Sequence, residues 1–325
     1  MASGIGYGKV ILFGEHFVVY GLPAIASAIS DTTVAEATLA RGAGGLEAGP
    51  ETFVLEGDGW TLYDNRPETP GYKKEKAAEQ RRAVELILSH LGIDTRKNPV
   101  NLALGGALKA ASGVGASAAA CAAIARALSS LFDLGLTDEE INRAAHEGEK
   151  GFHGTPSGID DTAATYGGLF LFKKEQPTNH IEMIRLRRPL EIVLGNTGIT
   201  SSTKAVVEEV RRRREAAPEK FSRIFSEAEA LALEAKEALE RGDVGRVGTL
   251  MTRNHELLRE LGVSCEELER LVELAIRAGA PGAKLTGTGR GGLMVALTPG
   301  VDLQERVARA IENAGFTALR TRIGC

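Results

Sequence analysis

The chain has 325 residues, of which 43% are hydrophobic and 25% are charged, and its formal net charge at pH 7 is −4. These values are typical of a globular protein long enough for two domains, and they give no reason to expect a nucleic-acid partner or an acidic membrane surface. Three widely spaced cysteines favour neither a disulfide framework nor a zinc site, and they indicate a reducing compartment. Because residues 1–10 do not resemble a secretory signal and no window approaches 18 uninterrupted apolar residues, we expect a cytoplasmic protein without a membrane span.

The first half of the chain alternates between strand and helix patterns. The signature Thr137 to Glu140 is a capping box, which predicts the start of a helix. In chain order we expect a buried strand at 9–13, two or three antiparallel strands within 24–57 divided by the Gly-rich segment 41–45, a loop at 60–72, a helix at 73–91, a strand at 99–104, helices at 117–131 and 138–150, and a strand at 169–172.

The pattern changes near residues 175–190, where we expect a boundary between a domain at 1–180 and a domain at 181–325. The basic run at 211–214 is interpreted as a solvated helix face. Here we expect strands near 181–186 and 191–194, a long helix carrying that basic run, helices at 221–241, 244–261 and 265–278, two strands that flank a Gly-rich turn within 284–297, a helix at 303–314 and a strand at 317–320.

A run of small residues at 110–120 leads directly into the Ala-rich helix. Gly113 and Gly115 allow positive φ and let a ligand approach the backbone closely. A helix N-terminus offers unpaired N–H groups that suit a phosphate, and the hydroxyl of Ser117 would lie in the first turn, within reach of a phosphate oxygen or of Mg²⁺. The alternative is tight packing of a helix on a sheet, which favours the same small residues. The run matches neither a Walker loop nor a dinucleotide fingerprint.

Polar residues stand at both ends of the first buried strand. Lys9 begins it, and Glu15 and His16 follow its end. These side chains either converge on a cleft or are an exposed lysine and a pair that caps a turn, which is the commoner arrangement.

Two further carboxylate positions are candidates for chemistry. Glu149 falls in the last turn of a helix, where a negative charge opposes the helix dipole, so it is either a cation ligand or a solvated partner of Lys150. The turn at 154–162 ends in adjacent Asp160 and Asp161, of which one is expected to face inward and the other solvent. Either aspartate could instead cap a helix.

Four of these stretches, in this order, resemble the GHMP small-molecule kinases: KVILFGEHFVVYG at 9–21, the Gly/Ser run at 112–120, GTPSGID at 154–160 and KLTGTGRGG at 284–292. The first and third resemble the members that phosphorylate mevalonate. The resemblance implies an α+β fold with two domains. It implies an N-terminal domain like ribosomal protein S5 domain 2, a ferredoxin-like C-terminal domain with extra helices, and a cleft between them.

The resemblance also implies an ATP- and Mg²⁺-dependent kinase that phosphorylates the 5-hydroxyl of mevalonate to give 5-phosphomevalonate and ADP, and it makes a homodimer plausible. It implies that Asp160 is catalytic with Lys9 beside it, that Ser117 and Glu149 hold Mg²⁺, and that Glu15, His16 and Thr203 line the mevalonate pocket. The third motif, 287–292, packs against the phosphate loop in this family. The implied phosphate-loop residues are Ser112, Gly113, Val114, Gly115, Ala116 and Ser117.

The chain departs from the family pattern at several positions. Residues 6–8 read Gly-Tyr-Gly where Pro-Gly is usual, the phosphate loop lacks the usual prolines, and Ala116 replaces the first of two serines. Arg290 stands where glycine is common, and it would either bind ATP or a phosphorylated substrate or point to solvent.

Alternatives to mevalonate as the acceptor are phosphomevalonate, homoserine or a sugar. A further alternative is a non-catalytic sensor of nucleotide and metabolite, in which at least one of Lys9, Ser117, Glu149 and Asp160 should be lost. All four are present. Whether Asp160 acts as a general base or as an orienting charge stays open.

Overall fold

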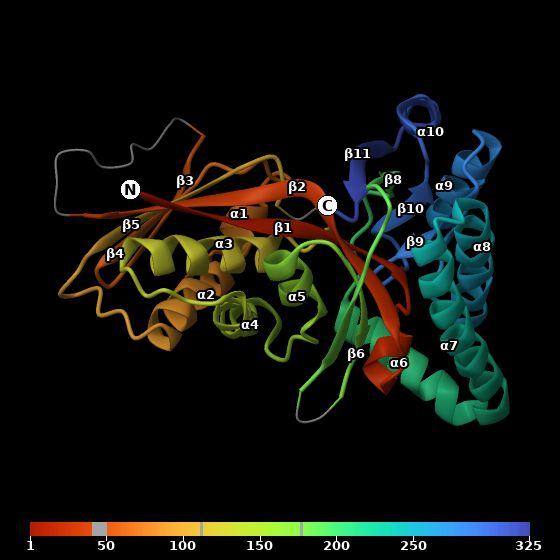
Figure 1. The fold of residues 1–325 in the computed structure, drawn as a ribbon, viewed down its shortest axis with the longest axis horizontal. Helices are drawn as coiled ribbons and strands as arrows, with labels where there is room; N and C mark the ends of the chain where they lie inside the picture. Colours follow the sequence, from red (N-terminus) through yellow and green to blue (C-terminus); the bar gives the residue numbers. More distant parts are fainter. Residues whose placement is uncertain (41–50, 111–112, 176–177) are drawn as a thin grey trace. The chain divides into compact units, whose positions relative to one another are not determined.

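The computed structural model describes residues 1–40, 51–110, 113–175 and 178–325 (Figure 1). The chain divides into two compact units. Unit 1 comprises Met1–Lys9 and Ser30–Gly167, and unit 2 comprises Val10–Ile29 and Gly168–Cys325. Strands β1 (Ala2–Phe13) and β2 (Ala24–Leu39) therefore contribute residues to both units. The first domain expected from the sequence, 1–180, includes residues 10–29. In the structure these residues lie in unit 2.

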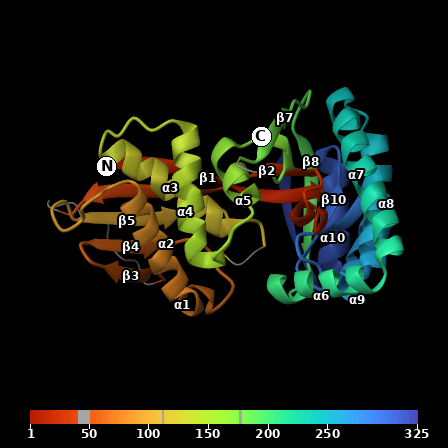
Figure 2. The same cartoon turned by 90° about the horizontal axis from the view of Figure 1, so that it is seen from below.

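Unit 1 is a sheet with helices on one face (Figures 1 and 2). Its strand order is β3 (Phe53–Gly57), β4 (Trp60–Asp64), β5 (Val100–Gly105), the second half of β2, and β1, and within it β4 and β5 run parallel. The helices are α1 (Tyr72–Glu75), α2 (Ala77–His90), α3 (Ala116–Leu131), α4 (Asp138–His153) and α5 (Ile159–Tyr166). The core lies between helices and sheet and includes Leu62, Ile87, Leu102, Ile124 and Ile141.

The small residues of α3 permit an unusually close approach to β1. A Cβ added at Gly6 would lie 2.0 Å from the carbonyl oxygen of Ala119, and one at Gly4 would lie 2.3 Å from that of Ala123. Tight helix packing, offered above as the alternative to a phosphate loop, is therefore real and coexists with the glycine turn that precedes α3. The capping box that was expected at Thr137 is also present, because the side chains and backbones of Thr137 and Glu140 bond reciprocally.

The loop predicted at 60–72 was wrong in its first part. Residues 60–64 form β4, which pairs antiparallel with β3 through Phe53↔Asp64 and Gly57↔Trp60. The polar composition of 60–72, with its Gly and Pro, favours a loop, whereas in the structure Asp64 is fully buried and accepts hydrogen bonds from Arg66 and Gln80.

Unit 2 has the connectivity β-α-β-β-α-β of a ferredoxin-like fold. Its four-strand order, β11 (Thr317–Ile323), β8 (Leu190–Asn196), β10 (Leu293–Leu297) and β9 (Gly282–Thr286), is antiparallel throughout. The extra helices α6 (Thr203–Ala216), α7 (Pro218–Arg241), α8 (Val244–Leu261) and α9 (Glu266–Arg277) lie between β8 and β9, and α10 (Val301–Asn313) precedes β11. The expected α+β class and the ferredoxin-like C-terminal half are thus confirmed.

A smaller part of unit 2 comes from the N-terminal segment. The start of β2 pairs with β6 (Leu169–Lys173), which pairs with β7 (His180–Ile184), and a single 3₁₀ turn spans Phe17–Tyr20.

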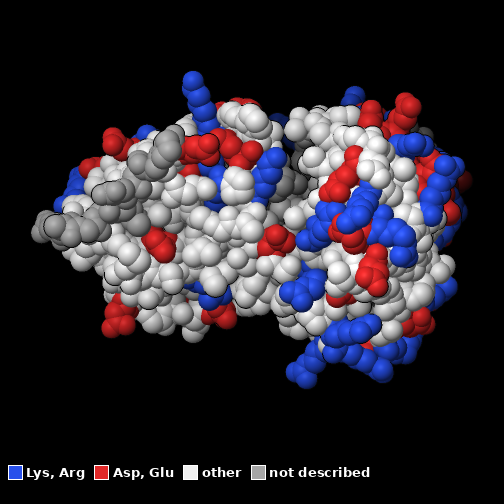
Figure 3. Space-filling model, turned by 90° about the horizontal axis from the view of Figure 1, so that it is seen from above, with Lys and Arg blue, Asp and Glu red and all other residues white. Residues whose placement is uncertain are grey.

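Lys and Arg side chains lie among Asp and Glu side chains on the face shown in Figure 3, in keeping with the small net charge. None of the helices in the described ranges combines the length and the apolar character needed to cross a membrane.

Candidate active site

The glycine turn before α3 forms one wall of a polar corner in unit 1. The backbone N–H of Lys9 donates to the carbonyl of Val114 at 2.8 Å, and Gly115 caps α3 with a φ of 71°. A Cβ at Gly115 would lie 2.8 Å from Lys9 Cγ and 3.8 Å from Asp160 Oδ2. Only glycine therefore fits here without displacing the lysine. Gly113 also has positive φ, Ala116 is buried in the first turn of α3, and the expected phosphate-loop residue Ser112 lies outside the described residues.

Lys9 and Asp160 meet in this corner. Lys9 Nζ lies 3.2 Å from Asp160 Oδ1, and the side chains are 11% and 28% exposed. Asp160 stands in the first turn of α5, which begins after Gly158 with a φ of 93°. A carboxylate in this position is stabilised by the helix dipole. The neighbouring Asp161 is buried instead, so the two aspartates face different surroundings, as expected.

Glu149 is buried beside this pair. Burial raises its pKa to about 8, the charge of Asp160 adds to that rise, and a hydrogen bond with Ser117 opposes it. Its Oε1 has no hydrogen-bond partner among the described residues. The alternative of a solvated Glu149 paired with Lys150 was wrong, because Lys150 pairs with Glu147 at 2.6 Å. The candidate cation ligand is thus a buried carboxyl with an unpartnered oxygen.

The donor set of Ser117 and Glu149 fits a hard divalent cation. Mg²⁺ prefers oxygen ligands and usually takes one or two from the protein, with the rest from phosphate and water. A cation would also explain why an unpartnered carboxyl is kept in a buried place. The described part of the chain has no cluster of three or more His, Cys, Asp or Glu side chains suited to a metal, but a two-ligand site does not need one.

A buried ion network supports the start of α3, and it was not predicted from the sequence. Arg66 donates to both oxygens of Asp64 and, at 2.9 Å, to the carbonyl of Ala116. Lys73 donates to the carbonyls of Asp64 and Arg66. The signal available in the sequence was weak, because Asp64 and Arg66 lie in a segment that reads as a polar loop.

A second polar cluster lies in unit 2, just after β1. Glu15 forms an ion pair with Lys284, and both side chains are fully buried. Lys284 also donates to the carbonyl of Leu285 at 2.7 Å, and burial lowers the pKa of its ammonium group. The sequence singled out Glu15 but indicated no role for Lys284, although Lys284 opens the KLTGTGRGG stretch at 284–292.

His16 and Thr203 are brought together by Thr288. The ring nitrogen Nε2 of His16 lies 2.7 Å from the carbonyl oxygen of Thr288, and the hydroxyls of Thr203 and Thr288 are 2.8 Å apart. His16 has a φ of 64°, which is unusual for a residue with a side chain. Burial lowers the pKa of its imidazole, so the ring is neutral at pH 7. Neutral His16 offers hydrogen bonding and not charge.

Arg290 forms an ion pair with a carboxylate. Its Nη1 and Nη2 each lie 2.6 Å from one oxygen of Glu209 in α6, and its side chain is 33% exposed. Neither expectation for Arg290, a phosphate ligand or a side chain pointing to solvent, anticipated this pairing.

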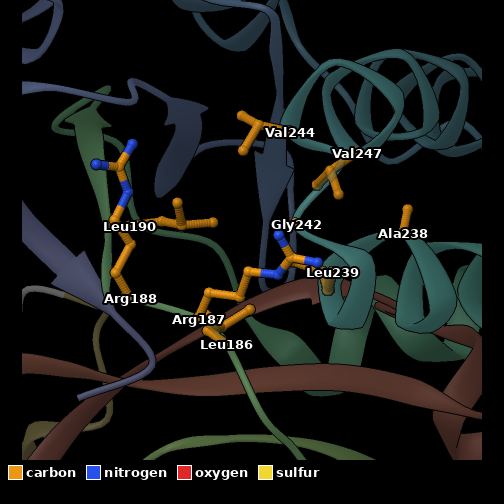
Figure 4. A pocket seen from close by; sticks show the side chains of 9 residues that line it. All are labelled: Leu186, Arg187, Arg188, Leu190, Ala238, Leu239, Gly242, Val244 and Val247. Atoms are coloured by element: carbon orange, nitrogen blue, oxygen red, sulfur yellow. The ribbon is translucent and has the colours of Figure 1, made fainter.

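A cavity of about 270 Å³ lies in unit 2 where α7 meets α8 (Figure 4). Arg187 extends toward Gly242 at its edge, and the remaining lining is mostly aliphatic. None of the expected site residues lines it. The lining residues are Leu186, Arg187, Arg188, Leu190, Ala238, Leu239, Gly242, Val244 and Val247.

Comparisons with known proteins identify related sequences and structures. A family model described as the GHMP kinases N terminal domain matches residues 79–168, and one described as GHMP kinases C terminal matches 235–317. The chain is 39% identical to a mevalonate kinase of Pyrococcus abyssi over 97% of this chain and 93% of the relative. It is 38% identical to one of Thermococcus gammatolerans, over 97% and 94%. A crystal structure of L. major mevalonate kinase in complex with R-mevalonate is similar, with 41% identity, a TM-score of 0.89 and coverage of 99% and 96%.

Proposed function

Since the chain belongs to the mevalonate kinase family, a branch of the GHMP kinases, we propose that this ATP-dependent kinase transfers the γ-phosphoryl group of ATP to the 5-hydroxyl of mevalonate. The products are 5-phosphomevalonate and ADP. The single observation that carries the proposal is the pairing of Lys9 with Asp160 at 3.2 Å beside the glycine turn. Homodimer formation and a cytoplasmic location remain predictions.

Asp160 and Lys9 supply what the acceptor hydroxyl needs. As the new O–P bond forms and the bond to ADP breaks, that hydroxyl must lose its proton, and Asp160 accepts the proton or holds the hydroxyl aligned. Such help is worth about 10²–10⁴ in rate. The ammonium group of Lys9 stabilises negative charge that develops on the attacking oxygen. Phosphoryl transfer depends mainly on positioning and charge neutralisation of this kind.

The glycine turn and α3 serve the nucleotide. The first N–H groups of an α-helix have no partner within the helix, and they carry the positive end of its dipole. The turn before α3 brings these N–H groups and the Ser117 hydroxyl to one place. We therefore assign the ATP phosphates to this turn, which comprises Gly113, Val114, Gly115, Ala116 and Ser117. The contact of Arg66 with the Ala116 carbonyl keeps the start of α3 in register.

We assign Mg²⁺ to Ser117 and Glu149, whose hydroxyl and unpartnered carboxyl oxygen suit that ion. When bound, the ion would neutralise phosphate charge. Glu149 must lose its proton to act as a ligand, and a nearby cation favours that loss.

For the acceptor we assign His16, Thr203 and Glu15. Glu15 is held in place by Lys284, and His16 and Thr203 are both oriented by Thr288. Because mevalonate carries hydroxyl groups and a carboxylate, a surface of neutral donors and acceptors next to a fixed carboxylate is suited to orient its hydroxyls.

The test is a coupled assay of ADP release with purified enzyme, ATP and Mg²⁺, in which mevalonate, phosphomevalonate, homoserine and galactose are compared side by side. We expect kcat/KM for mevalonate to exceed that for each other alcohol. A preference for any of the other three would overturn the assignment of the acceptor, and no ADP release with any of them would overturn the kinase proposal.

A further inference from the structure

Arg290 adopts a backbone conformation that its residue type disfavours. Its φ is 53°, in the left-handed region where glycine is at ease and residues with a Cβ are strained. Two neighbours, Gly289 and Gly291, have positive φ as well. A glycine would therefore satisfy the backbone at position 290 better than arginine does, so the side chain must have a use.

The side chain of Arg290 ties the turn 287–292 to two helices. Its guanidinium group makes a two-pronged pair with Glu209 of α6, at 2.6 Å for each prong, and contacts the carbonyl of Gly262 at the end of α8 at 3.3 Å. Its backbone N–H donates to the carbonyl of Val263 at 2.7 Å. Paired guanidinium–carboxylate contacts of this geometry fix orientation as well as distance.

The same turn also contacts residues assigned to the acceptor. The carbonyl oxygen of Thr288 forms a hydrogen bond with the His16 ring, and the hydroxyl of Thr288 forms one with the hydroxyl of Thr203. The carbonyl of Gly289 accepts a hydrogen bond from the hydroxyl of Ser201 at 2.7 Å. Only one residue separates Thr288 from Arg290. A shift of the backbone at 290 is therefore passed directly to the carbonyl and hydroxyl that orient His16 and Thr203.

We propose that Arg290 is a positioning residue for acceptor binding, which acts by clamping the turn 287–292 onto Glu209 so that Thr288 holds His16 and Thr203 in place. The inference rests on the proposed function for the roles of His16 and Thr203. In this role Arg290 acts through the turn and does not itself bind the substrate. A direct role in binding phosphate is disfavoured because Glu209 already neutralises its charge.

The matched variants are Arg290→Gly, Glu209→Gln and Arg213→Ala. Arg290→Gly removes the clamp and leaves a residue that adopts the same φ freely, so the fold is retained. Glu209→Gln weakens the clamp from the other side. Arg213 also pairs with Glu209, at 2.7 Å, but forms no hydrogen bond or ion pair with the turn 287–292 among the described residues, so Arg213→Ala is the control.

We expect Arg290→Gly and Glu209→Gln each to raise the KM for mevalonate by about tenfold while the KM for ATP stays within about twofold. The KM for mevalonate of the double variant should be no higher than that of Arg290→Gly, because both substitutions disrupt the same ion pair. Arg290→Lys should recover only part of the loss, since an ammonium group cannot make the two-pronged pair. Arg213→Ala should behave like the wild type.

Two results would overturn the inference. A raised KM for ATP in Arg290→Gly that Glu209→Gln does not share would make Arg290 a phosphate ligand, and unchanged KM values in both variants would leave it a structural residue only. The nitrogen resonances of His16 test the clamp without any assay. We expect a dominant Nε2–H tautomer in the wild type and a mixture in Arg290→Gly. An unchanged tautomer would also overturn the clamp, whether or not mevalonate proves to be the substrate.

Discussion

Lys9 Nζ lies 3.2 Å from Asp160 Oδ1, and Gly115 comes so close to both side chains that a single added carbon would disturb the pair. The three residues are 45 or more positions apart along the chain, and strand β1, the turn before α3 and the first turn of α5 bring them together. Substitutions at these residues and at the neighbouring Glu149 test the proposed catalytic site.

The first prediction concerns the carboxylate. Asp160→Asn keeps the size of the side chain but removes its charge and its ability to accept a proton. We expect kcat to fall by about 10²–10⁴ while the Kd for ATP changes little. Steady-state kinetics and nucleotide titration measure the two effects. Turnover near that of the wild type would remove Asp160 from the mechanism.

The glycine turn allows a steric test. In Gly115→Ala the new carbon would meet Lys9 Cγ at 2.8 Å and would also be strained by the positive φ of 71°. Gly135 has a similar φ of 61° with open space around it, so Gly135→Ala carries the strain alone. We expect both variants to lose about 1 kcal/mol of stability, from the strain, but only Gly115→Ala to lose most of its turnover. Equal activities would show that the close approach to Lys9 has no functional role.

The cation assignment is tested at Glu149. We expect Glu149→Gln to raise the concentration of Mg²⁺ needed for half-maximal activity by about tenfold or more, because a neutral amide is a weaker ligand than a carboxylate. Glu147→Gln, two residues away at a partly exposed position, is the control. A Mg²⁺ titration that superimposes on the wild type would exclude Glu149 as a ligand.

The buried pair in unit 2 predicts a stability effect. Lys284→Met leaves the carboxyl of Glu15 buried without its cation, so we expect the free energy of unfolding to fall by about 3–5 kcal/mol. The double variant Lys284→Met/Glu15→Gln should be less destabilised than Lys284→Met alone. Lys97 belongs to an exposed pair with Asp94, and Lys97→Met should leave stability unchanged in the same denaturant titration.

The pH dependence of acceptor binding follows from His16. Burial lowers the pKa of its imidazole below the usual value of about 6.5, so the neutral ring predominates from pH 8 down to about 6.5. We therefore expect the KM for mevalonate to be nearly constant between about pH 6.5 and 8. If the ring were the cation that receives the acceptor carboxylate, the KM would rise as pH increased through about 6.5, and such a rise would contradict the neutral assignment.

For His16 the sign of the linked stability effect is also defined. A histidine whose folded-state pKa is lowered binds fewer protons than it does in the unfolded chain, so its contribution to stability is present above about pH 6.5 and is lost as pH falls through the folded-state pKa. Thermal unfolding of His16→Gln should show a weaker acid dependence over that range than the wild type.

Local patterns were enough to place most of the elements. The Ala-rich run predicted α3 and the capping box predicted the start of α4. These two features are set by neighbours in the sequence, through helix propensity and end capping. The two-part α+β fold with a ferredoxin-like second half was instead implied by the resemblance of four motifs to the GHMP kinases. The prediction of a loop failed at 60–64, because a segment with polar residues such as Asp64 is buried there as strand β4.

The amino-acid sequence by itself therefore determined which residue types are available for phosphoryl transfer, and on which elements they stand. Only the tertiary structure decided their state: that Glu149 is buried and not paired with Lys150, that Lys284 holds Glu15, and that Arg290 is taken up by Glu209. The reason is physical. The ion pairs of the described residues join side chains up to 269 positions apart along the chain, and no local pattern records which distant partner a charge will meet.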